Sequence, residues 1–219
     1  MYDPRTNNIP PGYGRIRFSR VELQNILIAV GGLTLAFSLF FGIHYTFPGL
    51  SGTEQMVFSV VASLVAVLTG FMLHELGHKI MAQRSGAWAE FRAYPLGLLM
   101  AVVFAFVGFI FAAPGAVYIQ GMISRRQNGL ISLSGPMINM ALGVSFLAVA
   151  ILVNTGLLAL ALYLIGSINI LLAAFNLLPI PPLDGYKVLK WNVPVYVACF
   201  GAALVLAILV YTNMILELF

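Results

Sequence analysis

Charged side chains are scarce in this sequence of 219 residues, where Asp, Glu, Lys and Arg together make up 8%. Soluble domains carry about 25% of these residues, so the composition excludes an ordinary soluble domain. Cysteine is nearly absent, and a single Cys199 excludes both a disulfide framework and a cysteine-ligated metal site. The net charge is +4, but no basic run is interleaved with aromatic residues. We therefore expect a membrane protein that has no nucleic-acid partner.

Long hydrophobic runs account for most of the chain, and 61% of its residues are hydrophobic. Runs of this length cross a bilayer as helices, so the predicted fold class is an all-α polytopic membrane protein with about five to six transmembrane helices. Residues 1–24 are expected to form a cytoplasmic tail. Residues 25–219 are expected to form the membrane-embedded domain, with a core at about 56–190. The expected spans are 25–45, 56–82, 130–153, 157–178 and 193–216.

Residues 95–117 are apolar but are interrupted by Gly and Pro, so they allow two topologies. If they enter the membrane and return to the same side, all eleven Lys and Arg face one side. If they cross as a sixth span, the later basic residues move to the opposite side. The first arrangement fits the positive-inside rule better. It predicts a multi-pass protein of the cell membrane with a cytoplasmic N-terminus and mostly cytoplasmic Lys/Arg loops.

The sequence His74-Glu75-Leu76-Gly77-His78 lies near the end of the second expected span. Histidines four residues apart share one face of a helix and can bind one metal ion, and Glu75 is placed to act on water at that metal. The alternative is two hydrogen-bonded histidines beside a buried acid. A carboxylate in an apolar helix is costly unless it is paired, neutralised or bound to metal. The pattern therefore favours a metal site.

A catalytic zinc has three protein ligands and one open position, so the two histidines need a third partner. Asp184 is the preferred candidate, because the two preceding spans return the chain to the depth of the histidines. Its Pro-rich surroundings also allow an irregular backbone to fold inward. His44 is expected near the opposite face of the membrane. Glu90 is chemically suitable and stays open as an alternative.

Three motifs carry a resemblance to a known family. They are His74-Glu75-Leu76-Gly77-His78, Ser134-Gly135-Pro136-Met137-Ile138-Asn139 and the stretch from Asn176 to Leu183-Asp184-Gly185. Together they resemble the signatures of the site-2 proteases, which are intramembrane zinc metalloproteases. The chain resembles a minimal core of that family, with room for neither a PDZ domain nor a nucleotide-sensing module.

The resemblance implies one Zn²⁺ per chain, with His74, His78 and Asp184 as ligands and Glu75 as the catalytic base. It also implies that Asn176 contacts the substrate backbone or the developing oxyanion. Asn139 is a second candidate donor, although a helix–helix hydrogen bond is its alternative role. Gly135 and Pro136 are expected to shape a helix start and close packing.

A transmembrane substrate must be extended locally before its peptide bonds can be attacked. Residues 115–119 combine a Pro-Gly break with strand-forming residues, so Val117 and Ile119 are expected to bind an unwound substrate by strand addition. The alternative is that this stretch is only the returning limb of a re-entrant segment that contains a β-strand.

The function predicted from these features is hydrolysis of peptide bonds in or near the transmembrane segments of membrane proteins by an intramembrane zinc metalloprotease. Its partners would be transmembrane substrates and the lipid bilayer. A non-catalytic intramembrane metal-binding protein or a divalent-metal carrier is the alternative, and it would not need Glu75. The sequence specifies neither the substrate, nor its cleavage position, nor the oligomeric state.

Overall fold

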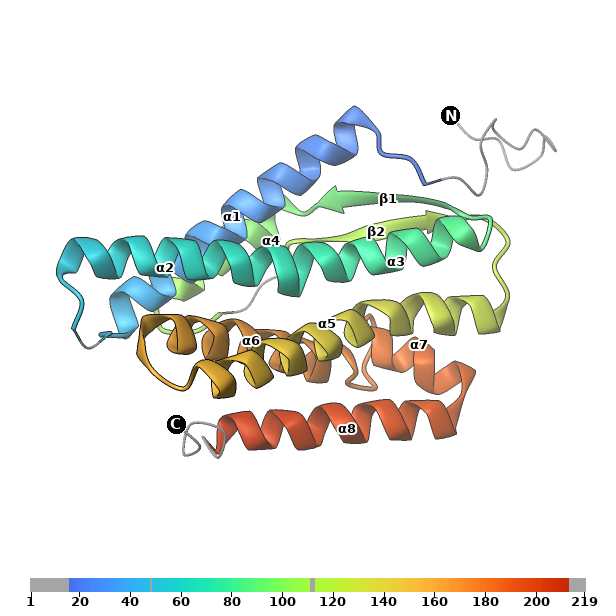
Figure 1. Ribbon diagram of the computed structural model, residues 1–219. Coiled ribbons are helices and arrows are strands. Elements are labelled where there is room, and N and C mark those ends of the chain that lie inside the picture. The colour runs from blue at the N-terminus through green and yellow to red at the C-terminus, as the bar shows by residue number, and fades with distance from the viewer. Residues whose placement is uncertain (1–15, 48, 111–112, 213–219) are drawn as a thin grey trace.

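The computed structural model describes residues 16–47, 49–110 and 113–212, in which long helices run side by side (Figure 1). Residues 1–15, most of the expected tail, lie outside the described residues. The elements in chain order are α1 (Arg20–His44), α2 (Gly52–Val67), the π-helical turn η1 (Leu68–Met72), α3 (Leu73–Arg84), β1 (Trp88–Ala93), α4 (Pro95–Phe106), β2 (Gly115–Gln120), α5 (Arg125–Val153), α6 (Gly156–Asn176), α7 (Asp184–Trp191) and α8 (Val193–Tyr211).

Among the described residues, five helices are long and apolar enough to cross a membrane. They are α1, the continuous α2–η1–α3 rod of 33 residues, α5, α6 and α8. This result confirms the predicted polytopic all-α fold class. Two helices begin about five residues earlier than expected. The N-cap residues explain the difference, since Ser19 accepts the Glu22 N–H and Ser124 forms a capping box with Gln127.

The segment after α3 is re-entrant, and the strand pair shows how it returns. β1 and β2 pair antiparallel, and Ala93 lies opposite Gly115. The Tyr94 N–H also donates to the Pro114 carbonyl at 2.9 Å. Both ends of the intervening stretch are therefore held at one place, and its helix α4 has only 12 residues. The structure thus favours the re-entrant prediction over a sixth span. It also reveals the strand β1, which the sequence analysis does not predict.

The basic residues of the described chain gather toward one end of the molecule. This end contains the start of α1, the end of α3, the start of α5 and α7 (Figure 1). The segregation agrees with the charge pattern that predicts the topology. The cytoplasmic orientation of this end stays a prediction.

Helix α5 is the central packing element, because it lies against α3, α6 and α7. Small residues allow these close approaches, as is usual between membrane helices. At Gly77, between the two motif histidines, an added Cβ would lie 2.6 Å from Ile138 Cδ1. The close approach of α3 and α5 therefore depends on glycine at this position of the motif.

Candidate metal centre

A π-helical turn directly precedes the two motif histidines. π-bulges are rare inside α-helices and often occur at functional sites. Here the carbonyl of Gly70, within η1, accepts a hydrogen bond from Asn139 Nδ2 at 3.0 Å. Thr69 Oγ1 accepts another from Asn169 Nδ2 at 3.1 Å. Side chains of α5 and α6 thus hold the irregular turn that sets the rotation of α3.

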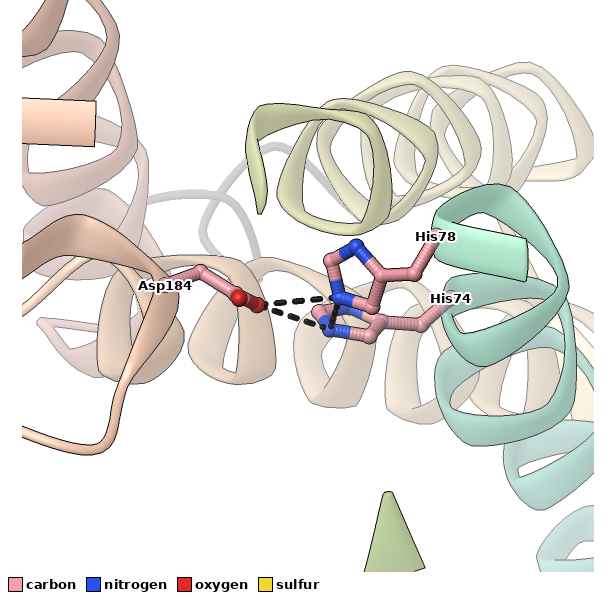
Figure 2. A group of neighbouring side chains, drawn as sticks. All are labelled: His74, His78 and Asp184. Atoms are coloured by element: carbon pink, nitrogen blue, oxygen red, sulfur yellow. Dashed lines mark hydrogen bonds and ion pairs between the residues drawn. The ribbon is translucent and has the colours of Figure 1, made fainter. Parts of the chain in front are cut away.

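Three side chains meet beyond this turn, two from α3 and one from the start of α7 (Figure 2). The Nε2 atoms of His74 and His78 lie 3.0 Å apart. Asp184 Oδ2 lies 3.4 Å from the first and 3.0 Å from the second. All three residues are buried. The described structure therefore brings together residues about a hundred positions apart, as the topology argument predicts for Asp184.

The spacing of these atoms fits a tetrahedral zinc. Ligand atoms about 2.0–2.1 Å from such an ion lie about 3.3 Å from each other, and a catalytic site keeps the fourth position open. Gly135 of α5 keeps space beside the ligand atoms. An added Cβ there would lie 2.6 Å from Nε2 of both His74 and His78. The donor set of two imidazoles and one carboxylate is also one that zinc accepts.

The partners of the three candidate ligands differ. His78 Nδ1 lies 2.7 Å from the Ile131 carbonyl, a contact that directs Nε2 toward the centre. His74 Nδ1 is buried and has no hydrogen-bond partner among the described residues. Asp184 Oδ1 accepts from Lys187 Nζ at 3.3 Å. Burial alone would raise the pKa of the Asp184 carboxyl, but the histidines and Lys187 outweigh burial and hold that pKa well below its usual range. The carboxylate is the form of this side chain that binds metal.

Glu75 lies beside the ligands but faces the strand pair. Its Oε2 accepts the Val117 N–H at 3.1 Å. Glu75 also borders a cavity of about 200 Å³ between α1, α3 and the strands. The candidate base therefore stands between the metal ligands and β2.

Val117 and Ile119 both lie in β2, half-buried, and face the same way. Val117 lies opposite Phe91 of β1, yet the N–H groups of these two residues donate to Glu75 and Glu22 rather than to each other's strand. They form a non-hydrogen-bonded pair, so the backbone groups of Val117 point away from β1. The edge of β2 opposite β1 is therefore turned toward α3.

Asn139 contacts the neighbouring helical rod, and its substrate-binding role stays an untested prediction. Its side chain is fully buried and donates to Gly70, which is the helix–helix role named as the alternative. Gly135 and Pro136 do pack closely, but they lie inside α5 rather than at a helix start. The capping box at Ser124 extends the helix through the polar stretch before them.

The two other residues considered as ligands, and the candidate donor Asn176, lie in other contacts. His44 Nε2 lies 2.9 Å from the Ala105 carbonyl. Glu90, on β1, contacts Ser19 Oγ and pairs with Arg92 at 2.7 Å. Asn176 ends α6, and its amide donates to the Leu172 carbonyl of its own helix at 2.9 Å.

Sequence reasoning missed one polar cluster beside the centre. Glu22 of α1 and Lys79 of α3 form a fully enclosed ion pair against β1. The signal was present, because Lys79 directly follows His78 and Glu22 opens an apolar span. Ionisable residues at such depth are rare without a role.

Comparison with curated proteins finds several relatives. MJ0611 of Methanocaldococcus jannaschii is 41% identical over 182 residues, covering 80% of this chain and 87% of its own length. Rip2 of Mycolicibacterium smegmatis is 32% identical over 203 residues, covering 84% and 74%. YwhC of Bacillus subtilis is 29% identical over 153 residues, covering 60% and 68%. Each is named as a proposed zinc metalloprotease. No family model and no solved structure matches the chain.

Proposed function

This chain belongs to the zinc metalloprotease family that includes MJ0611, and from that premise we propose that it is an intramembrane endopeptidase of the site-2 type. The observation that carries this proposal is the position of the metal centre. His74 and His78 belong to a membrane-spanning rod, and Asp184 follows another span. A catalytic centre within the membrane region suits substrates that lie in the same membrane.

The cofactor is Zn²⁺, and we propose that His74, His78 and Asp184 bind one ion per chain. Zinc, when bound, supplies Lewis acidity that polarises a peptide carbonyl and makes water a better nucleophile. The protein holds the ligands in place before binding, through the Ile131 carbonyl on His78 and the space at Gly135.

Glu75 is the proposed general base. Its Oε2 is held by the Val117 N–H, so Oε1 is the atom that takes a proton from water and later delivers it to the leaving amine. Its place between the ligands and β2 supports this role, because water and a substrate beside β2 would both lie within its reach.

The substrate would bind as an added strand along the edge of β2 that faces away from β1. We call it the open edge, because no strand pairs with it among the described residues. Main-chain hydrogen bonds give affinity in this mode, and alternate side chains give specificity. Val117 and Ile119 present their backbone groups to this edge. Asn176 is the proposed donor to the substrate backbone or oxyanion, and its Nδ2 has a second N–H beside the one that donates to the Leu172 carbonyl. The partners are transmembrane proteins in the lipid bilayer, and the basic end of the molecule is proposed to be cytoplasmic.

The decisive experiment replaces Glu75 by Gln and measures both zinc content and cleavage. The purified protein in liposomes is mixed with a panel of fluorescent single-span reporter proteins. We expect about one zinc per chain in parent and variant, and cleavage only in the parent. Glu54→Gln, at the exposed start of α2, is the matched control and should cleave normally. A parent that carries zinc across the membrane and cuts no reporter would instead identify a metal carrier.

A further inference from the structure

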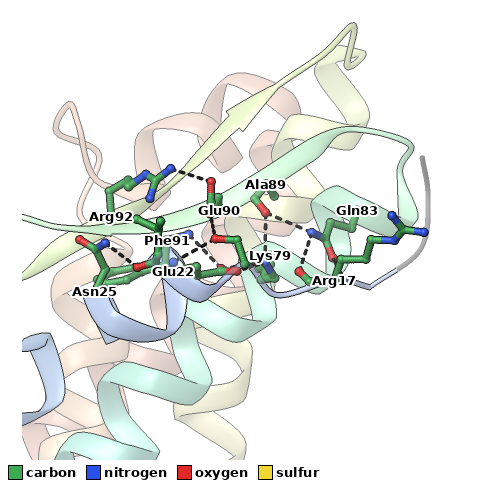
Figure 3. Close-up of polar contacts among 11 residues, drawn as sticks. Arg17, Glu22, Asn25, Lys79, Gln83, Ala89, Glu90, Phe91 and Arg92 are labelled. Atoms are coloured by element: carbon green, nitrogen blue, oxygen red, sulfur yellow. Dashed lines mark hydrogen bonds and ion pairs between the residues drawn. The ribbon is translucent and has the colours of Figure 1, made fainter. Parts of the chain in front are cut away.

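The edge of β1 that faces away from β2 is closed by side chains of α1 and α3 (Figure 3). We propose that the buried pair Glu22–Lys79 at this edge positions the strand pair relative to the metal centre. The inference rests on the proposed function, since positioning matters only if a substrate binds beside β2. Both residues act through the strands and are positioning residues, not catalytic ones.

The ion pair joins three elements at one point. Lys79 Nζ on α3 lies 2.7 Å and 2.6 Å from the two carboxylate oxygens of Glu22 on α1. The same ammonium donates to the Ala89 carbonyl of β1 at 3.1 Å. Glu22 Oε1 in turn accepts the Phe91 N–H of β1 at 3.0 Å. Lys79 has three N–H donors, and each therefore has an acceptor.

The neighbouring backbone groups of this edge are also paired. Gln83 Nε2 donates to the Ala89 carbonyl at 3.1 Å, and Asn25 Oδ1 accepts the Ala93 N–H at 2.9 Å. These side chains contact alternate residues of β1, which is the spacing of groups along one strand edge. A shift of β1 by one residue would turn these groups inward and break every contact. The edge therefore fixes the position of β1 along its own axis.

The position of β1 is transmitted to the candidate base in two steps. Phe91, held by Glu22, lies opposite Val117 in the strand pair. Val117 donates its N–H to Glu75. Lys79 directly follows His78, so the helical turn that presents an imidazole also carries the ammonium. A displacement at the pair would therefore move the open edge of β2 relative to Glu75 and the metal ligands.

Packing beneath the strands fixes this position in part, because Phe91 and Val117 pack against the core of α1 and α4 but also border a cavity. The cavity of about 200 Å³ lies between the strand pair, α1 and α3, and is lined by apolar side chains that include Phe71, Leu76, Phe91 and Val117. Side chains next to a cavity lack contact partners on one side. The polar contacts at the outer edge therefore add a directional restraint on the position of the strands relative to Glu75.

Stability alone does not account for an ion pair with exposures of 2% and 0%. Removing two charges from water offsets much of their attraction, and an apolar pair of similar volume often stabilises a fold equally well or better. An apolar pair cannot, however, hold the Phe91 N–H and the Ala89 carbonyl in place. The double substitution Glu22→Leu/Lys79→Met therefore separates positioning from stability.

The test compares two zinc-binding probes on the zinc-loaded protein in detergent. Acetohydroxamate contacts only the metal centre, whereas a tetrapeptide hydroxamate can also pair with the open edge of β2. In the double variant we expect unchanged zinc content and unchanged acetohydroxamate affinity. We expect the peptide hydroxamate to bind at least about tenfold more weakly, because its backbone no longer meets the strand in register.

Two further variants make the result specific. Glu22→Gln/Lys79→Met retains an amide oxygen for the Phe91 N–H and should recover part of the lost peptide affinity. Tyr163→Phe removes a buried hydrogen bond between α6 and α8, 3.2 Å long, and should leave the ratio of the two affinities unchanged. If the Leu/Met variant binds the peptide probe as tightly as the parent, the positioning role is overturned while the proposed function stands. If the zinc-loaded parent binds neither probe, the proposed function itself fails, and the inference fails with it.

Discussion

The two strands of the re-entrant segment each present one edge away from the other, and these edges differ in kind. The outer edge of β1 meets Glu22, Asn25 and Lys79, which bind its backbone groups. The open edge of β2 has one such contact from a charged side chain, the Glu75 carboxylate on the Val117 N–H. That carboxylate is the candidate base.

Unpaired strand edges invite pairing with another chain, and proteins usually cover them. In apolar surroundings this need is greater, because each unsatisfied backbone group costs several kcal/mol there. An edge left open beside a metal centre is therefore best explained by the strand that will pair with it. In our proposals, the outer edge of β1 fixes the position of the strand pair, and the open edge of β2 pairs with the substrate.

The largest expected effect comes from removing the metal while leaving both edges intact. In Asp184→Ala the centre loses one of three ligands, so we expect clearly less than one zinc per chain and no detectable cleavage. Mass spectrometry of the purified protein measures the zinc. The matched control is Glu90→Ala, an acid on the closed-edge strand, which should keep its zinc. If Glu90→Ala loses zinc and Asp184→Ala retains it, the ligand assignment is wrong.

The next effect comes from the open edge and the contact that it makes with Glu75. Val117→Pro removes the N–H that points away from β1, a position where strands tolerate proline. We expect cleavage of the reporters to fall about a hundredfold, the loss typical of a substrate misplaced by about 1 Å, with zinc content unchanged. Val117→Ala keeps the N–H and should lose far less. Equal losses in the two variants would show that the side chain, not the edge, matters.

The sequence predicts the metal ligands and the candidate base better than it predicts the two strands. His74, Glu75 and His78 could be found because helical spacing is local. Asp184 followed from the number of spans, a coarse property that hydropathy encodes well. Pro136 was misplaced because proline favours helix starts, whereas the helix start is actually set by the N-cap Ser124, well before Pro136.

The strand β1 was missed for a different physical reason. Its letters Trp-Ala-Glu-Phe-Arg-Ala include two charges, which resemble a polar connection. Yet Glu90 is buried, because Ser19 and Arg92 satisfy its carboxylate. The partners that make these six residues a strand come from β2 and from α1, far away in sequence. No local pattern reports such partners. Asn139 was likewise ambiguous until its acceptor, a carbonyl exposed by a π-helical turn, was visible.

The smallest expected effect tests whether the outer edge of β1 acts through the backbone groups that it holds in place or through its charge. Arg92 pairs with Glu90 at 2.7 Å on the same strand as the buried contacts, but its side chain is 37% exposed. Ion pairs with an end open to water contribute about 0–1 kcal/mol, and Gln keeps an N–H donor for the buried Glu90 carboxylate. Within the described structure, Arg92 binds no backbone group of β1 through its side chain. Arg92→Gln should therefore lower the free energy of unfolding by less than about 1 kcal/mol and leave cleavage unchanged.

Denaturant unfolding in detergent and the reporter assay measure these two quantities for Arg92→Gln beside the Glu22/Lys79 variants. If Arg92→Gln impaired peptide binding as strongly as those variants, the outer edge would act through its total charge. If only the buried pair matters, the edge acts through the backbone groups that Glu22 and Lys79 hold. Arg92 is next to Phe91, the residue that Glu22 holds. A difference between Arg92→Gln and the Glu22/Lys79 variants could therefore not be explained by distance from the Glu22–Lys79 pair. It would have to come from which atoms each side chain binds.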